Sequence, residues 1–285
     1  MKLLRYGNPG QERPGILDAQ GRLRDLAAQV GDIDDTVIGH QGLSRLATID
    51  TSTLPIVDDG VRLGPPVARV GKIICVGMNY ADHAAETGAS VPEQPVLFMK
   101  ATSSIVGAYD EVMIPRGSLK TDWEVELGIV IGTMARDVSD ADALHHVAGY
   151  LVVNDVSERA FQLEHGGQWV KGKGCDTFGP LGPWLVTADE IPDPQNIGLW
   201  LEVNGHRYQQ GNTRTMVFGV AHLVSYISRY MTLLPGDIIS SGTPAGVGLG
   251  QHPPVYLRPG DVMELGIEGL GQQRQRVVAH PADAS

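Results

Sequence analysis

The chain has 285 residues, of which 42% are hydrophobic and 19% are charged, and its formal net charge at pH 7 is −11. A chain of this length and composition can bury a core of its own, which excludes an intrinsically disordered protein. The negative charge repels both a nucleic-acid backbone and an anionic membrane surface, so neither is expected as a partner. If the substrate is an anion, a local cation must bind it.

The sequence shows no sign of export or membrane insertion. Its first residues, MKLLRYGNPG, lack the apolar stretch of a signal peptide, and no segment approaches the ~18 apolar residues that a membrane-spanning helix needs. The two cysteines, Cys75 and Cys175, are expected to be buried thiols rather than part of a disulfide framework. We therefore expect a cytoplasmic protein.

Residues 1–70 are expected to form a small N-terminal module rich in β-strands. The segment GILDAQGRLRDL predicts a hairpin that turns over Ala19, Gln20 and Gly21. The segment VDDGVRLGPPVARVG, which contains several glycines and prolines, indicates a linker to the rest of the chain.

Residues 71–285 are expected to form the catalytic domain. Short strands separated by Gly/Pro turns are predicted in KIICVG, PVLFMK, WEVELGIVIG, HVAGYLVVNDV, IGLWLEVNG, GDIISSG and DVMELGIEGLG. Two helices are predicted: SDADALHHVAG, where Ser139 and Asp142 match a capping box, and VFGVAHLVSYISRYM, which is apolar at helical spacing. This pattern predicts a strand-dominated α+β fold with few helices.

The segment TDWEVELGIVIG predicts a strand with carboxylates on one face. Side chains alternate between faces, so Trp123 and Val125 share one face, while Asp122, Glu124 and Glu126 share the other. One interpretation is a solvated strand face. However, LGIVIG is apolar on both faces, which indicates a buried strand, and a buried carboxylate cluster needs a cation. We therefore expect a divalent metal there.

A further carboxylate is expected at the end of another strand. In GYLVVNDVSER the apolar run ends at Asn154 and Asp155, and a carboxylate in this position commonly faces a site. Asp155 could instead cap the turn that follows. Together with Glu124 and Glu126 it would provide only oxygen donors, which favours Mg²⁺, with Mn²⁺ as the alternative, and leaves positions open for water and substrate.

The segment GQWVKGKGCDTFGP contains a lysine flanked by glycines. Gly167, Gly172 and Lys173 match the first part of a phosphate-binding loop, but Gly174 replaces the required Ser or Thr, so that loop is excluded. Lys173 can either hold a carboxylate or an enolate, or lie in solvent. In SSGTPAGVGLG, Thr243 can offer its hydroxyl group to a substrate.

Taken in order, seven segments resemble the fumarylacetoacetate hydrolase family across roughly residues 72 to 280. They are KIICVGMNYADHAAE, QPVLFMK, DWEVELGIVIG, GYLVVNDVSER, KGKGCDTFGPLGPWL, LWLEVNG and GDIISSGTPAGVG. The resemblance implies a twisted, rolled β-fold of the mixed roll or sandwich type and a homodimer. It also implies a Mg²⁺ ion bound by Glu124, Glu126 and Asp155.

The resemblance is to the acylpyruvate hydrolase branch of the family, and it implies roles for further residues. His83 and Glu86 match a catalytic pair on a short helix, three positions apart. The catalytic lysine of the family matches Lys173 better than Lys171, although KGCDTF departs from the usual sequence of that loop. Further positions that bind the substrate in the family match Arg159, Gln162 and Thr243.

On a helix, residues i and i+3 share a face, so Glu86 can orient the imidazole of His83 and leave its other nitrogen to take a proton from water. The pair could instead be two polar residues on the wet side of a helix. A 2,4-diketo acid suits the catalytic interpretation, because its C1 carboxylate and C2 oxygen can chelate Mg²⁺ while water attacks C4. Cleavage of the C3–C4 bond then releases pyruvate.

Among the hydrolases that act on such substrates, the sequence of the chain resembles those of 2,4-diketo-3-deoxy-sugar acids such as 2,4-diketo-3-deoxy-L-rhamnonate. Two alternatives remain open. One is a decarboxylase or isomerase of an unsaturated keto-diacid, of the oxaloacetate or hydroxymuconate type, and the other is a catalytically silent metal-binding dimer. The pair His83 and Glu86 argues against both, because neither needs activated water.

Overall fold

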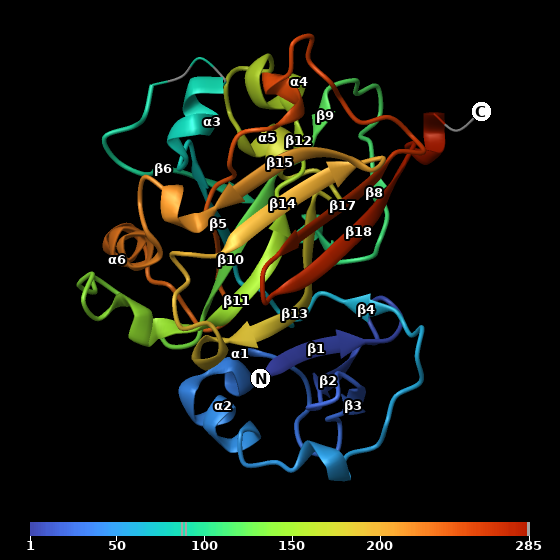
Figure 1. The fold of residues 1–285 in the computed structure, drawn as a ribbon, viewed down its shortest axis with the longest axis vertical. Coiled ribbons are helices and arrows are strands. Elements are labelled where there is room, and N and C mark those ends of the chain that lie inside the picture. The colour runs from blue at the N-terminus through green and yellow to red at the C-terminus, as the bar shows by residue number, and fades with distance from the viewer. Residues whose placement is uncertain (87, 89, 284–285) are drawn as a thin grey trace.

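A computed structural model describes residues 1–86, 88 and 90–283. Figure 1 shows a five-stranded sheet lying over the central strands of a larger sheet, with the N-terminal segment packed at one end of the molecule. The described residues form six α-helices, of which the longest is α6 (Val220–Tyr230). The predicted strand-dominated α+β class with few helices is therefore confirmed.

The larger sheet has the order β3-β2-β1-β13-β11-β10-β16-β5-β6, and two short strands, β4 and β7, pair at its side. Its strands are β1 (Lys2–Tyr6), β2 (Arg13–Leu17), β3 (Leu23–Asp25), β4 (Leu63–Gly64), β5 (Ile73–Gly77), β6 (Val96–Lys100), β7 (Ile105–Gly107), β10 (Val125–Ile131), β11 (Val147–Asn154), β13 (Gly179–Thr187) and β16 (Ile238–Ser240). The strands that were predicted between residues 72 and 154 and at residues 236–242 lie in this sheet.

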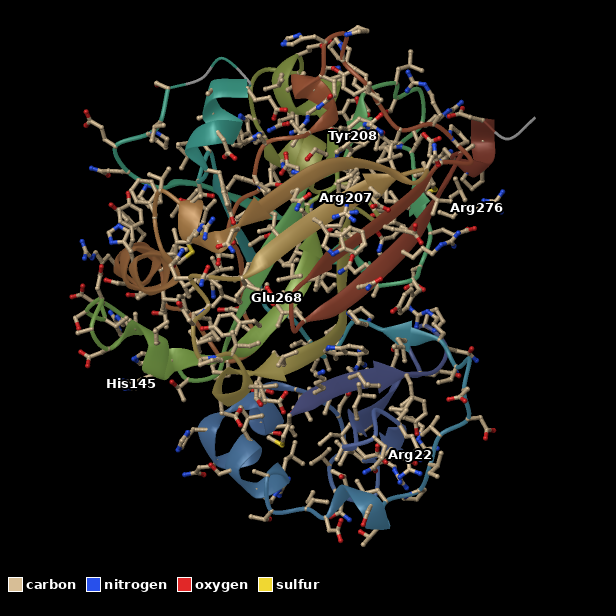
Figure 2. The ribbon with its side chains drawn as sticks, viewed as in Figure 1. Arg22, His145, Arg207, Tyr208, Glu268 and Arg276 are labelled. Atoms are coloured by element: carbon tan, nitrogen blue, oxygen red, sulfur yellow. The ribbon has the colours of Figure 1, made fainter. Side chains whose placement is uncertain are left out.

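The second sheet has the order β15-β14-β17-β18-β8. Its strands are β8 (Val112–Met113), β14 (Gly198–Val203), β15 (His206–Asn212), β17 (Val262–Ile267) and β18 (Gly271–Val278), and a separate pair is formed by β9 (Thr121–Asp122) and β12 (Ser157–Glu158). Polar side chains such as Arg207 on β15 and Arg276 on β18 lie on this sheet, far from Arg22 in the N-terminal segment (Figure 2).

The central strands are apolar on both faces because each face is covered. Leu127 and Ile129 of β10 pack in a core with Leu201 of the second sheet. Val130, on the opposite face of β10, packs in another core with Leu3 of the N-terminal segment. Each such fully buried side chain contributes ~1.5–3 kcal/mol relative to an exposed one. Toward its start, the second face of β10 changes from apolar residues to carboxylates.

The N-terminal segment contains the predicted hairpin, formed by β2 and β3. Asp18 fixes its turn by accepting hydrogen bonds from the backbone N–H groups of Gln20 and Arg22, both at 2.9 Å. The segment also contains α1 (Asp35–Ile38) and α2 (His40–Leu46), which were not expected from the sequence. Because β1 pairs with β13, the segment extends the larger sheet, and the division at residue 70 stays a prediction.

Two helix predictions had different outcomes. Helix α6 is confirmed, and its buried face includes the expected Leu223 and Ile227. The capping pair near residue 140 is also present, since Asp142 accepts from Ser139 Oγ at 2.7 Å. However, only a 3₁₀ turn, Ala143–His146, follows it, because β11 begins at the next residue.

Three short helices gather at the end of the molecule opposite the N-terminal segment (Figure 1). They are α3 (Ala81–Glu86), α4 (Arg159–Leu163) and α5 (Val170–Lys173). No helix in the described part of the chain is both long enough and apolar enough to cross a bilayer.

Candidate active site

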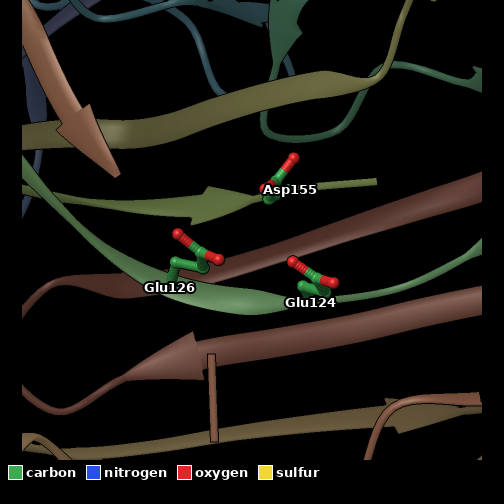
Figure 3. Close-up of side chains that lie close together, drawn as sticks. All are labelled: Glu124, Glu126 and Asp155. Carbon is green, nitrogen blue, oxygen red and sulfur yellow. The ribbon is translucent and has the colours of Figure 1, made fainter. Parts of the chain in front are cut away.

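The carboxylates of Glu124, Glu126 and Asp155 converge where β10 begins and β11 ends (Figure 3). The two strands are antiparallel and pair Val125 with Asn154, so their ends lie side by side. The backbone N–H of Asp155 also donates to the carbonyl of Glu124 at 2.9 Å. One oxygen of each carboxylate lies within 4.8 Å of the others, and all three residues are buried. The antiparallel register therefore assembles the cluster.

Three cations surround two of these carboxylates. Lys173 Nζ lies 2.8 Å from Glu124 Oε2 and 2.7 Å from Asp155 Oδ2. Lys100 Nζ lies 2.6 Å from Asp155 Oδ1, and Arg159 Nη2 lies 2.7 Å from Glu124 Oε1. Although burial alone would raise the pKa of Glu124, the charges of Lys173 and Arg159 lower it below its usual value. Glu124 is therefore held as an anion.

Glu126 lies in a different electrostatic environment. Its Oε2 accepts hydrogen bonds from Ser240 Oγ at 2.6 Å and from the N–H of Gly242 at 2.9 Å. Among the described residues, no ion pair involves Glu126. Burial, followed by the charges of Asp155 and Glu124, raises its pKa well above the usual value. The cluster therefore has room for one more positive charge beside Glu126, and a divalent ion would supply it.

The donor set fits a hard divalent cation. Three buried carboxylates provide only oxygen ligands, which suit Mg²⁺ or Mn²⁺ better than softer metals. Glu124, Glu126 and Asp155 are the residues that would hold such an ion.

Two expectations about neighbouring acidic residues change. Asp122 was expected to line up with Glu124 and Glu126, but its Oδ1 accepts from the N–H of Gly248 at 2.7 Å, and its Oδ2 accepts from Arg159 Nε at 2.8 Å. It orients the arginine instead of joining the cluster. The alternative that Asp155 caps the following turn does not hold, because Glu158 caps α4.

The location of Lys173 excludes its alternative in solvent. It is the last residue of α5 and is only 1% exposed. Lys171, two residues earlier, is exposed and donates to the carbonyl of His165 at 2.6 Å. The structure therefore brings Lys173, and not Lys171, to the carboxylates.

His83 and Glu86 lie on α3, with His83 Nδ1 3.6 Å from Glu86 Oε2. His83 is 8% exposed, so it does not lie on a solvent-exposed face of the helix, as the alternative required. Both oxygens of Glu86 accept from the N–H of Gly246, at 2.9 and 3.0 Å. Gly246 has a φ of 109°, and a Cβ there would lie 2.0 Å from the carbonyl oxygen of Tyr208. Only glycine suits this anchoring position.

These groups line one cavity of about 170 Å³. Its charged lining residues include His83 and members of the carboxylate–cation cluster, and its apolar lining residues include Val76, Phe98, Leu163, Trp169 and Leu249. The cavity is therefore lined by both ionic and apolar side chains, and we call the apolar set the apolar wall.

The expected substrate residues also line this cavity. Arg159 Nη1 donates to Gln162 Oε1 at 3.0 Å, which leaves the amide nitrogen of Gln162 to donate elsewhere. Thr243 Oγ1 donates to the carbonyl of Val125 at 2.9 Å and accepts from Gln209 at 2.8 Å, so its proton is engaged. The roles assigned to these residues stay predictions.

Several residues of the site were not found from the sequence, and four of them have clear roles in its structure. Lys100 and Ser240 bind the carboxylates, and Phe98 and Trp169 form part of the apolar wall. Lys100 is the last residue of a correctly predicted strand, but its contact with Asp155 depends on the order of strands in the sheet. No local pattern indicates that order.

The model of the family described as "Fumarylacetoacetate (FAA) hydrolase C-terminal" matches residues 72–278. The chain belongs to the fumarylacetoacetate hydrolase family. Over 276 residues it is 64% identical to a protein from Burkholderia multivorans that carries only a provisional hydrolase name, with 96% of this chain and 98% of that protein covered. The family resemblance that was stated from the sequence is therefore confirmed.

Solved structures of the family superpose on nearly the whole chain. A fumarylacetoacetate hydrolase from Exiguobacterium antarcticum has a TM-score of 0.88 at 40% identity, covering 98% of this chain and 100% of its own. A maleylpyruvate hydrolase from Sphingobium sp. SYK-6, in complex with manganese(II) and pyruvate, has a TM-score of 0.82 at 30% identity, covering 98% of this chain and 99% of its own. A 5-carboxymethyl-2-hydroxymuconate delta-isomerase from Mycobacterium smegmatis has a TM-score of 0.76 at 33% identity, covering 98% of this chain and 99% of its own. The family thus includes hydrolases and isomerases.

Proposed function

We propose that this protein is a divalent-metal-dependent hydrolase that cleaves the C3–C4 bond of a 2,4-diketo acid, giving pyruvate and a second carboxylic acid. The proposed substrate is a 2,4-diketo-3-deoxy-sugar acid such as 2,4-diketo-3-deoxy-L-rhamnonate. The observation that carries the proposal is that His83 lines the same cavity as Glu124 and Glu126. A base for water and a site for a metal thereby face one substrate.

The proposed cofactor is Mg²⁺, with Mn²⁺ as the alternative, bound by Glu124, Glu126 and Asp155. A divalent ion bound there would supply a Lewis acid for the C1 carboxylate and C2 oxygen of the substrate. Support comes from the all-carboxylate donor set and from the manganese in the related maleylpyruvate hydrolase.

His83 is the proposed general base. Its Nδ1 faces Glu86, so Nε2 is the atom that would accept a proton from water. Glu86 is itself fixed by the N–H of Gly246, and its negative charge stabilises the imidazolium that forms. The water oxygen adds to C4, the C3–C4 bond breaks, and its electron pair forms the enolate of pyruvate, which is then protonated at C3.

The remaining residues are proposed to bind and stabilise. The ammonium group of Lys173 is positioned to stabilise negative charge that develops on the enolate. Arg159 holds Glu124 and orients the amide of Gln162, which can donate to a substrate oxygen. Thr243 is proposed as a further substrate contact through its oxygen, since its proton is directed to Val125.

The second candidate function is isomerisation or decarboxylation of an unsaturated keto-diacid, which the related isomerase from Mycobacterium smegmatis favours. Such reactions need enolate stabilisation but no attack by water. The pair of His83 and Glu86 beside the carboxylates supports hydrolysis instead.

A panel of 2,4-diketo acids tests the proposal, with pyruvate measured by coupled reduction and with oxaloacetate and an unsaturated keto-diacid as competitors. We expect release of pyruvate and one equivalent of a second acid from the diketo acids, dependent on Mg²⁺ or Mn²⁺. Full activity in excess chelator would contradict the metal requirement. Faster turnover of the keto-diacid would favour the second function, and no turnover of any compound would favour a catalytically silent metal-binding protein.

We also propose that the protein acts as a homodimer in the cytoplasm on a small anionic 2-keto acid. Sedimentation equilibrium of the purified protein tests the dimer, for which we expect twice the chain mass of 30.5 kDa. A monomer at micromolar concentration would contradict it.

A further inference from the structure

We propose that the apolar wall of the cavity selects diketo acids with a short, uncharged acyl tail, and that Trp169 sets this selectivity. The inference rests on the proposed function, because it concerns the part of the substrate beyond C4. It separates the substrate of this protein from 2,4-diketo acids that carry a second carboxylate.

The first argument is the distribution of charge around the cavity. Among the described residues that line it, only His83, Arg159 and Lys173 can be cationic. Arg159 and Lys173 are already paired with carboxylates of the cluster. The proposed reaction requires His83 to be neutral when it accepts a proton. None of these groups is left to bind a carboxylate at the far end of a substrate.

The second argument is the cost of placing a charge against the other wall. Phe98, Trp169 and Leu249 offer aromatic and aliphatic surface to a ligand. Moving a carboxylate from water to such a surface without a partner is strongly unfavourable, because its hydration is lost. An uncharged alkyl or hydroxyalkyl tail has no such penalty, and its apolar atoms gain from leaving water.

The third argument is that the indole of Trp169 is held in place. Its ring lies edge-on to Phe98, with centroids 5.3 Å apart and an interplanar angle of 64°. A Cβ on Gly77 would lie 2.5 Å from Trp169 Cζ3, so the absence of a side chain at Gly77 lets the indole pack there. The ring of Phe98 lies 5.1 Å from Lys173 Nζ. Phe98 therefore connects the wall to the catalytic lysine.

The size of the cavity sets the length of the tail. Its volume is about 170 Å³, and a dry cavity of roughly 150 Å³ in a protein core admits one benzene molecule. The pyruvyl part of the substrate must occupy the ionic side. A tail of only a few carbon atoms then fits against Trp169.

The test uses a matched pair of substrates, 2,4-dioxoheptanoate and 2,4-dioxoheptanedioate, which differ by a terminal carboxylate. With the Mg²⁺-loaded protein we expect kcat/KM to favour the uncharged tail by at least about tenfold. Trp169→Arg should reduce or invert this ratio, because it places a cation in the wall. Trp169→Phe should preserve the preference, since the wall stays apolar.

Val170→Arg is the matched control. Val170 follows Trp169 directly and begins α5, is 47% exposed and does not line the cavity, so a cation there should leave the substrate ratio unchanged. Mn²⁺ affinity measured by calorimetry shows whether each variant keeps the folded site. A shift of the ratio in Val170→Arg equal to that in Trp169→Arg would assign the effect to general charge and overturn the role of Trp169.

The outcomes separate this inference from the proposed function. Equal or better turnover of the dicarboxylate by the parent protein overturns the inference but supports a diketo acid hydrolase. If neither compound is cleaved, the proposed function fails, and the tail preference is decided by calorimetric binding of the same pair to the Mn²⁺-loaded protein. Tighter binding of the dicarboxylate then overturns the inference as well.

Discussion

Lys173 Nζ donates a 2.7 Å hydrogen bond to Asp155 Oδ2 and a 2.8 Å hydrogen bond to Glu124 Oε2, and so joins two carboxylates that belong to different strands. Burial alone would lower the pKa of Lys173, but the charges of Asp155 and Glu124 raise it. Lys173 is therefore a structural cation as well as a proposed catalytic group. From the sequence alone, a loop lysine with little influence on folding would be expected.

Lys173→Met should reduce both turnover and stability. Within the part of the chain that the structure describes, removing the ammonium group leaves Glu124 paired only with Arg159 and Asp155 paired only with Lys100. Each lost hydrogen bond between charged groups typically costs ~1.5–3 kcal/mol in the free energy of unfolding. Loss of transition-state stabilisation should lower kcat/KM by a factor that corresponds to roughly 2–4 kcal/mol in activation free energy. Urea unfolding in chelator and steady-state kinetics measure the two effects. Lys171→Met is the matched control, and equal stability of both variants would show that the pairs of Lys173 contribute nothing.

Glu126→Gln should separate metal binding from folding. The amide oxygen of Gln can still accept from Ser240 and Gly242, while the repulsion from Glu124 and Asp155 disappears. In chelator we expect stability unchanged or raised by up to ~2 kcal/mol. Mn²⁺ affinity measured by calorimetry should fall by at least about tenfold, because a charged ligand is lost. Unchanged Mn²⁺ affinity would remove Glu126 from the metal site.

His83→Ala should abolish hydrolysis and leave metal binding intact, because His83 is proposed as a base and not as a ligand. General bases typically contribute about 10²–10⁴-fold in rate. Glu86→Gln should have a smaller effect in the same direction, since it keeps an acceptor for the N–H of Gly246 and loses only the charge. Pyruvate release and Mn²⁺ calorimetry provide the two readouts.

Decarboxylation of oxaloacetate is the control reaction for the pair. It needs enolate stabilisation and no base for water, so any such activity should largely survive in His83→Ala. If His83→Ala and Glu86→Gln both hydrolyse diketo acids at the parent rate, the proposed mechanism is wrong.

Gly246→Ala should destabilise the protein more than an ordinary substitution at a glycine of positive φ. The backbone conformation alone costs ~1–2 kcal/mol for a residue with a Cβ, and the contact with the carbonyl of Tyr208 adds to it. Gly10→Ala measures the first effect by itself, because Gly10 has a φ of 76° and its Cβ would meet nothing within 4 Å. Urea unfolding of both variants gives the difference, and equal values would contradict the steric argument.

The family, the strand-dominated fold class and the main strands could all be predicted from the sequence. Alternation and apolar runs are local properties, so the strands around Glu124 and before Asp155 could be located without a structure. The carboxylate cluster could be predicted for the same reason, because a carboxylate on a strand that is apolar on both faces has no access to water. Helix α2, in contrast, has only two apolar side chains, Leu43 and Leu46, and both pack against the N-terminal core.

The pairing of charged side chains, in contrast, depends on the three-dimensional fold. Asp122 and Glu124 share a strand face by alternation, yet the turn at Gly248 and the guanidinium of Arg159 take Asp122 away from the cluster. Lys100 ends β6 and Asp155 follows β11, and β5, β16 and β10 lie between these two strands in the sheet, so their contact depends on the three-dimensional shape of the sheet. Such contacts between distant residues depend on strand order and sheet curvature, which are fixed by the packing of the whole chain rather than by any local segment.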